Sequence, residues 1–193
     1  MYECFREVPA RRDAKSRLLF DFTMMDLADI QLLALDVDGV LTDGTLIISS
    51  DGSESKFFNA LDGHGLRMWQ RAGLKVALIS GRQSPPTQLR AEQLGIEHVF
   101  QDCHFKLPVI EKLLEQIDLA PDKVAYIGDD LPDLPVMRYV GFAVAVANAV
   151  DEVKRHADYV TARPGGGGAV RETIEYILKG TDKWRKLMER YLP

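Results

Sequence analysis

The sequence predicts an α/β fold, namely a Rossmann-like parallel sheet flanked by helices with one β-hairpin inserted. From Gln31 onward, short runs of Val, Ile and Leu alternate with amphipathic stretches of helical period, which is typical of a buried parallel sheet covered by helices. One segment, at about 45–58, breaks this rhythm with a strong turn signal. The chain has 193 residues, 46% of them hydrophobic, which is enough for one sizeable core.

Six short apolar runs are the expected strands, and the last of them is the weakest. They are residues 32–37, 75–79, 98–100, 123–127, 142–146 and 158–160. The stretches with helical period that lie between and after them are 65–72, 85–94, 107–117, 132–140, 149–156, 168–178 and 181–191. Because helices separate successive strands, the strands are expected to be parallel.

The hairpin is expected at about 45–58, where segments 45–49 and 54–58 flank Asp51-Gly52. Its strands carry Leu46, Ile48 and Phe57 among other apolar residues, so apolar groups would point to both faces. An isolated hairpin is only marginally stable in water, so something must cover it. We expect other copies of the chain to do so, with their arms pairing into a shared barrel; packing onto the chain's own body is the alternative.

Composition limits the class of protein. The formal charge of −5 argues against a nucleic-acid surface, and no apolar run approaches the roughly 18 to 20 residues of a membrane span. Cys4 and Cys103 are far apart and lack metal-ligand spacing, which favours a reducing, cytoplasmic location. Residues 1–28 lack the layout of a signal peptide and are expected to be a poorly ordered N-terminal extension before a domain at 29–193, with Met24 or Met25 as a candidate original start.

A pair of acids at the end of the first strand is the strongest chemical signal. Asp36 and Asp38 follow the apolar run at 32–35 and precede Gly39. Ligand crevices in open parallel sheets lie outside the carboxyl ends of the strands. An acidic turn or a helix cap would account for one of these residues, but two crowded carboxylates need a cation to offset their repulsion.

The run Asp36-Val-Asp-Gly resembles the first signature of the haloacid dehalogenase superfamily, and three further signatures have matches in the same order. Ser80 follows a strand, Lys106 opens a helix, and Gly128-Asp129-Asp130 ends another strand and continues to Asp133. Each element alone is weak. Their order at the ends of successive predicted strands would bring them together in one crevice.

The resemblance implies a role for each matching residue. Asp36 would attack phosphorus to form an aspartyl phosphate, and Asp38 would act as general acid and then general base. Ser80 and Lys106 would donate to the phosphoryl oxygens. Mg²⁺ would be held by the Asp36 carboxylate, the Asp38 backbone carbonyl and Asp129. Asp130 would orient the waters bound to the metal without binding the metal itself.

Room for a cap domain is missing, because the stretches between Asp38, Ser80 and Lys106 are already used by the predicted elements. The chain resembles a capless subclass that removes phosphate from an eight-carbon sugar acid, in segments 36–44, 62–66, 80–84, 126–137, 157–161 and 168–172. One departure is Phe105, since that subclass often has Asp before its lysine. The partners so implied are a small sugar acid phosphate and the chain itself, as a homotetramer.

The substrate contacts implied by this resemblance are the segment after the hairpin, three arginines and the helix-opening lysine. They are Asn59, Ala60, Leu61, Asp62, Gly63, Arg67, Arg82, Arg90 and Lys106, together with Asp38. Arginine offers paired donors for carboxylate and phosphate groups. The alternative is that the arginines, above all Arg67 and Arg90, are ordinary solvated helix residues.

Three further points stay open. The rival substrate is a related nine-carbon sugar acid 9-phosphate, and the rival class of protein is a non-catalytic oligomerisation module. The run Gly165–168 is expected to be a flexible junction, with an anion-binding turn as the alternative. By resemblance, the C-terminal tail from about 165 to 193 would act as a lid over the site.

Overall fold

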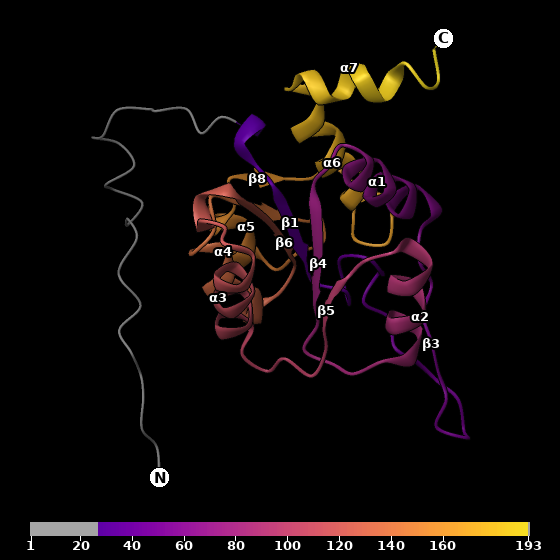
Figure 1. Cartoon of the computed structure of the whole chain (residues 1–193). Coiled ribbons are helices and arrows are strands. Elements are labelled where there is room, and N and C mark those ends of the chain that lie inside the picture. The colour runs from indigo at the N-terminus through magenta and orange to yellow at the C-terminus, as the bar shows by residue number, and fades with distance from the viewer. Residues whose placement is uncertain (1–26, 193) are drawn as a thin grey trace.

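The computed structural model describes residues 27–192 and contains a six-stranded parallel sheet (Figure 1). Most of the predicted N-terminal extension, residues 1–26, lies outside the described residues. The strand order is β5-β4-β1-β6-β7-β8, and every neighbouring pair is parallel. The strands are β1 (Leu32–Leu35), β4 (Lys75–Ile79), β5 (His98–Phe100), β6 (Val124–Gly128), β7 (Phe142–Ala145) and β8 (Tyr159–Val160). The predicted Rossmann-like fold is confirmed.

Helices cover both faces of the sheet. On one face α1 (Ala60–Arg71) and α6 (Ala169–Lys179) pack together beside α2 (Pro85–Leu94), and on the other α3 (Lys106–Ile117), α4 (Leu134–Met137) and α5 (Asp151–His156) lie side by side (Figure 1). Strands β1 and β6 in the middle are wholly buried, as expected for a sheet covered twice. No helix among residues 27–192 is long and apolar enough to cross a membrane.

Helix α1 begins at Ala60, five residues before the predicted start at Gly65. Asn59 is its N-cap, and its side-chain oxygen accepts the N–H of Leu61 at 2.8 Å. Glycine disfavours helix interiors, which is why the sequence misplaced this boundary. Gly63 lies under the guanidinium of Arg90, which would have to move to admit a Cβ at this position.

The single helix predicted at 132–140 is also wrong, because the structure has two short helical segments there. A 3₁₀ turn, Leu131–Asp133, comes first, and α4 that follows spans only Leu134–Met137. Pro132 and Pro135 each stand near the start of their own short helix, where a missing N–H is tolerated. For the remaining helices and the strands of the six-stranded sheet, the predicted bounds either coincide with the observed ones, as for β4, α2 and β5, or differ by at most three residues.

The hairpin is present, but its ladder is short. Strands β2 (Ile47–Ile48) and β3 (Glu54–Ser55) pair antiparallel over two residues each, fewer than the predicted 45–49 and 54–58. The arm projects from the body at the end of the molecule opposite α7 (Asp182–Met188) (Figure 1). Only this hairpin and α1 separate β1 from β4, and only α2 separates β4 from β5, so neither of these two stretches holds a cap domain.

The expectation of a C-terminal lid from Gly165 onward is not met in this structure. The apolar face of α6 enters the core, where Val170, Ile174 and Leu178 are fully buried. Gly165 and Gly166 pack against the loop after β1, and the N–H of Gly166 donates to the carbonyl of Val40 at 3.0 Å. The glycine run is therefore a packed turn in this structure. The amphipathic pattern of α6 drives this packing against α1.

Candidate active site

Polar side chains gather at the carboxyl ends of three adjacent strands. Asp36 follows β1, Ser80 follows β4 and Asp129 follows β6, while β1 lies between the other two strands in the sheet. The three strands end at the same level of the sheet, because Leu35 of β1 pairs with both Leu78 of β4 and Ile127 of β6. Topology therefore brings these three positions into one crevice, where open parallel sheets bind ligands.

Asp36 and Lys106 form a buried ion pair in the crevice. Nζ of Lys106 lies 2.9 Å from Oδ1 of Asp36 and 2.7 Å from Oδ1 of Asp133. Burial and then the negative charge of Asp133 raise the pKa of Asp36 to about 6, although Lys106 opposes this shift. Burial works against the charged form of Lys106, but the two carboxylates outweigh it and raise the lysine's pKa. A permanently charged ammonium beside a carboxylate can attract a phosphate group.

Asp133 holds this arrangement together. Its Oδ1 accepts hydrogen bonds from Lys106 and, at 2.6 Å, from the hydroxyl of Tyr126. Its Oδ2 accepts the backbone N–H groups of Asp129 and Asp130 at 2.9 and 3.3 Å. The side chain is completely buried. Four donors occupy its oxygens, so Asp133 fits the role of a scaffold for the loop after β6 better than that of a metal ligand.

Asp129 has the features of a cation ligand. Its Oδ1 is buried and has no hydrogen-bond partner among residues 27–192. Burial, followed by the charges of Asp36 and Asp133, raises its pKa to about 8. Oxygen atoms of Asp36, Asp129 and Asp133 lie within 4.8 Å of one another. Crowded carboxylates with an unsatisfied buried oxygen suit a hard divalent cation, which takes oxygen ligands and would offset the repulsion.

The side chain of Asp38 forms an ion pair with a lysine of the hairpin. Its Oδ1 accepts a hydrogen bond from Nζ of Lys56 at 2.5 Å, while its Oδ2 is buried without a partner among the described residues. Glu54 lies close by, with Oε1 3.8 Å from Lys56 and 3.4 Å from a guanidinium nitrogen of Arg82. The hairpin thus contributes two charged residues to the crevice.

Ser80 is almost fully buried at the end of β4. Its backbone N–H donates to the carbonyl of Phe100, and its Oγ accepts the N–H of Arg82 at 3.2 Å. Arg82 leaves one terminal nitrogen buried without a partner among residues 27–192. That nitrogen is a donor available for a ligand in the crevice.

Other predicted substrate contacts have partners within the protein. Asn59 caps α1 and also donates to the carbonyl of Gly166 at 3.1 Å. Asp62 is fully buried and accepts the N–H of Arg171 at the start of α6 at 2.8 Å. Burial raises the pKa of Asp62. These two residues connect α1 to the glycine run and to α6. Ala60 and Leu61 lie exposed in the first turn of α1.

The two remaining arginines contact other parts of the body. Arg67 on α1 donates to the carbonyl of Gln93 at 2.8 Å, near the C-terminal end of α2. Arg90 lies over the ring of Phe58, 5.7 Å from its centre. Neither is brought to Asp36 within this chain, so their contact with substrate stays a prediction.

Three site residues were missed by sequence reasoning. Glu54 in β3 and Lys56 just after it lie on the same side of the chain by the period of two, but nothing in the sequence indicates that this side meets Asp38. Tyr126 did carry a signal, because its hydroxyl in an otherwise aliphatic buried strand requires a partner.

The side chain of Asp130, which was predicted to orient waters, is exposed. Its Oδ1 accepts the N–H of Leu131.

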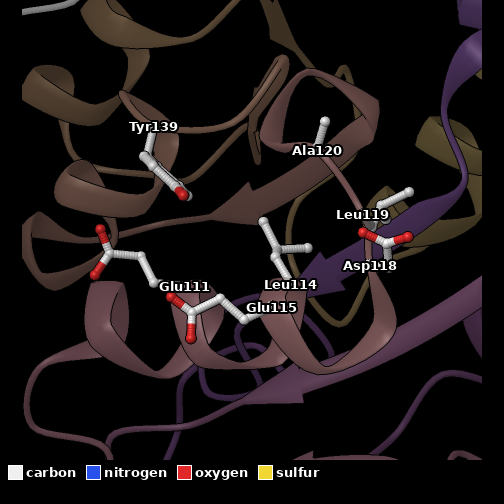
Figure 2. A pocket seen from close by; sticks show the side chains of 7 residues that line it. All are labelled: Glu111, Leu114, Glu115, Asp118, Leu119, Ala120 and Tyr139. Atoms are coloured by element: carbon white, nitrogen blue, oxygen red, sulfur yellow. The ribbon is translucent and has the colours of Figure 1, made fainter.

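Two hollows on the described surface lie elsewhere. One, of about 480 Å³, is bounded by the C-terminal part of α3 and by Tyr139, and Figure 2 shows its acidic side chains Glu111, Glu115 and Asp118. The other, of about 650 Å³, lies between β8 and α6. Neither hollow is lined by Asp36, Lys106 or Asp129. The candidate site is therefore identified by its cluster of charged side chains and not by the volume of a pocket.

A parallel sheet without a cap domain, with paired acids after β1 and a buried lysine–aspartate pair, defines a hydrolase of the haloacid dehalogenase-like class. The model of the haloacid dehalogenase-like hydrolase family matches residues 98–172. A 3-deoxy-D-manno-octulosonate 8-phosphate phosphatase of Escherichia coli is 45% identical over 160 residues, covering 83% of this chain and 85% of that protein. The chain belongs to the 3-deoxy-D-manno-octulosonate 8-phosphate phosphatase family of these hydrolases.

Solved structures agree with this assignment. The enzyme of that name from Moraxella catarrhalis, in complex with magnesium, phosphate and 3-deoxy-D-manno-octulosonate (KDO), superposes with a TM-score of 0.84 at 39% identity. The alignment covers 86% of this chain and 95% of that one. A probable YrbI family phosphatase from Pseudomonas syringae gives a TM-score of 0.84 at 46% identity, covering 89% and 99%.

Proposed function

We propose that this protein is a magnesium-dependent phosphatase that hydrolyses 3-deoxy-D-manno-octulosonate 8-phosphate to the free sugar acid and phosphate. The buried Asp36–Lys106 pair at the carboxyl end of β1 is the observation that carries the reaction type. Relatives of the same name, covered over most of their length, support the substrate. The product is a precursor of lipopolysaccharide, so the reaction would serve lipopolysaccharide biosynthesis.

Asp36 is the nucleophile in this proposal. Lys106 and the N–H of Val37 both contact its Oδ1, at 2.9 and 2.7 Å, which holds that oxygen in place. An oxygen of Asp36 attacks phosphorus as the bond to the sugar oxygen breaks, giving an aspartyl phosphate. Asp38 protonates the leaving oxygen, and later takes a proton from the water that releases phosphate from Asp36.

Lys106 and Ser80 stabilise the charge on the phosphoryl oxygens. Lys106 already lies between two carboxylates, and its charge is therefore retained during the reaction. Preorganised donors of this kind are often the largest contribution to catalysis, because they need no rearrangement when charge develops. Arg82, with one buried nitrogen lacking a partner among the described residues, would contact the substrate.

The magnesium site would consist of the Asp36 carboxylate, the Asp38 backbone carbonyl and Asp129, with Asp130 orienting waters around it. Bound there, Mg²⁺ supplies positive charge that lets an anionic nucleophile approach an anionic phosphate. The unsatisfied Oδ1 of Asp129 supports this assignment. Asp133 is left out of the ligand set because its oxygens already accept four hydrogen bonds.

Self-association through the hairpin, as a homotetramer, belongs to the same proposal. Leu46, Ile48 and Phe57 on the arm are 49%, 65% and 75% exposed, which leaves apolar surface for another copy to cover. Phe58 packs against the core, so part of the arm is anchored to its own body. A neighbouring copy would complete a crevice that has no cap domain. The cytoplasmic location stays a prediction.

Phosphate release from a panel of sugar acid phosphates, with and without magnesium, tests the proposal. We expect the eight-carbon 8-phosphate to give the highest kcat/KM, and EDTA to abolish turnover. A preference for a nine-carbon sugar acid 9-phosphate would move the substrate assignment to that rival. No release from any sugar acid phosphate in the presence of magnesium would contradict the proposal and favour a non-catalytic module.

A further inference from the structure

Lys56 occupies the inner face of the hairpin. Along residues 54–58 the exposure of the side chains alternates, so that Glu54, Lys56 and Phe58 are partly buried while Ser55 and Phe57 are exposed. The Lys56 side chain is only 1% exposed. Lysine is almost never buried to this degree without an oppositely charged partner.

The partner of Lys56 is the carboxylate that the proposed mechanism uses for proton transfer. Nζ lies 2.5 Å from Oδ1 of Asp38, the geometry of a charge-assisted hydrogen bond. Oδ2 of the same carboxylate is buried and accepts no hydrogen bond from residues 27–192. The two oxygens of Asp38 thus differ: Oδ1 is held by Lys56, whereas Oδ2 has no protein partner among the described residues and is available to exchange a proton with a ligand.

The geometry points to Lys56 as a positioning residue for Asp38, an inference that rests on the proposed phosphatase mechanism. By holding Oδ1, Lys56 fixes the carboxyl group so that Oδ2 carries the transferred proton. In the first half-reaction the proton on Oδ2 passes to the sugar oxygen as its bond to phosphorus breaks and the bond to Asp36 forms. In the second, Oδ2 takes a proton from water as the water oxygen bonds to phosphorus and the bond to Asp36 breaks.

Glu54 connects this contact to substrate recognition. Its Oε1 lies 3.8 Å from Lys56 and 3.4 Å from Arg82, so one hairpin carboxylate lies beside both the positioning lysine and a predicted substrate contact. The position of the hairpin therefore affects both catalysis and binding in the same crevice.

Lys56→Met, which removes the charge and keeps the length, tests the inference with p-nitrophenyl phosphate. Its leaving group departs as a stable anion without a proton, so the first half-reaction is spared while hydrolysis of the aspartyl phosphate is slowed. We expect a burst of about one p-nitrophenolate per site, and then a steady rate at least about tenfold below that of the unsubstituted protein. With the sugar acid phosphate, kcat falls similarly while KM stays within about threefold.

A double-mutant cycle separates positioning from a general structural effect. In the Asp38→Asn background, Lys56→Met should change the rate by less than about threefold, because Lys56 acts through Asp38. Lys56→Arg keeps the cation and should recover part of the loss. Lys112→Met, on the exposed face of α3, is the matched control and should leave the rate and the melting temperature unchanged.

Two results would overturn the inference. One is a KM raised about tenfold or more with kcat unchanged, which would make Lys56 a substrate contact. The other is the absence of a burst together with full additivity in the cycle, which would make its role structural. A protein that hydrolyses p-nitrophenyl phosphate but no sugar acid phosphate would contradict the proposed substrate and leave this test intact.

Discussion

At the scale of single residues, burial decides what the acids of the crevice can do. Asp36 and Asp129 both have raised pKa values because burial and neighbouring carboxylates penalise their charge. Lys106 compensates for part of this repulsion at Asp36, and a divalent cation would compensate for the rest. The site is therefore arranged for added positive charge, as a phosphoryl-transfer site requires.

Asp36→Asn should lower turnover by at least about 10³-fold while the fold is retained, because an amide of the same shape cannot attack phosphorus. Lys106 keeps Asp133 as a partner in this variant, so its charge is not left unpaired. Phosphate release and the melting temperature measure the two effects. Activity within tenfold of the unsubstituted protein would rule out Asp36 as the nucleophile.

The raised pKa of Asp129 predicts a pH-dependent stability in the metal-free protein. Its folded-state value of about 8 lies above its ordinary value of 3.8, so the stability contribution is complete below about pH 4 and is lost as pH rises through about 8. Urea unfolding in EDTA at pH 5.5 and 8 should show a larger loss of stability for the unsubstituted chain than for Asp129→Asn. Equal losses in both proteins would contradict the shift.

Magnesium should reverse this trend, because it binds the ionised form of Asp129. We expect the ion to raise the free energy of unfolding more at pH 8 than at pH 5.5, and to have little effect on Asp129→Asn. An equal stabilisation of both proteins by magnesium would place the ion elsewhere.

At the scale of elements, the glycine run between β8 and α6 supports the loop that carries the acids. A Cβ at Gly165 would lie 1.7 Å from the carbonyl oxygen of Gly39, the residue after Asp38. Asp62 on α1 accepts the N–H of Arg171 on α6, which fixes the end of the run. The loop after β1 thus packs against the glycine run, a segment that lies far away in the sequence.

Gly165→Ala should therefore destabilise the protein by about 1 to 3 kcal/mol and reduce turnover, because the loop with Asp38 must shift. Gly180→Ala is the matched control, since its φ is −75° and a Cβ there meets nothing closer than 3.5 Å. Urea unfolding and phosphate release measure the effects. Identical behaviour of the two variants would contradict this role of the glycine run.

At the scale of the whole molecule, the two faces of the hairpin have different surroundings. Glu54 and Lys56 reach the crevice, whereas Ile48 and Phe57 remain exposed on an arm that projects from the body (Figure 1). Assembly through the outer face would fix the arm, and with it the contact between Lys56 and Asp38.

Ile48→Lys combined with Phe57→Glu should convert the assembled protein into a monomer of about the 21.7 kDa chain mass. Charges placed on this apolar surface would be buried without partners in an interface, which is costly. Sedimentation velocity at micromolar concentration measures the change. Leu192→Lys, at an exposed residue beyond α7, should leave assembly intact. An unsubstituted protein that sediments as a monomer would contradict the proposed association.

The sequence by itself determined the strands of the sheet and their alternation with helices, because periodicity is a local signal. The acids Asp36 and Asp38 were visible at a strand end, whereas Ser80, Lys106 and Asp129 were predicted through the family resemblance. The sequence misplaced the start of α1, because glycines at 63 and 65 weaken the helical signal, and only the structure shows Gly65 packed against Arg171 of α6. Proline spacing at 132–135 likewise shortened a helix that the apolar pattern had extended.

Only the tertiary structure decided which charges meet. The pairing of Lys106 with both Asp36 and Asp133, and the contact of Lys56 with Asp38, join residues 18 to 70 positions apart in the chain. No period or spacing encodes such contacts, because they depend on how the hairpin and the strands are placed in space. The sequence predicted the acids after β1, but only the folded structure shows which lysines contact them.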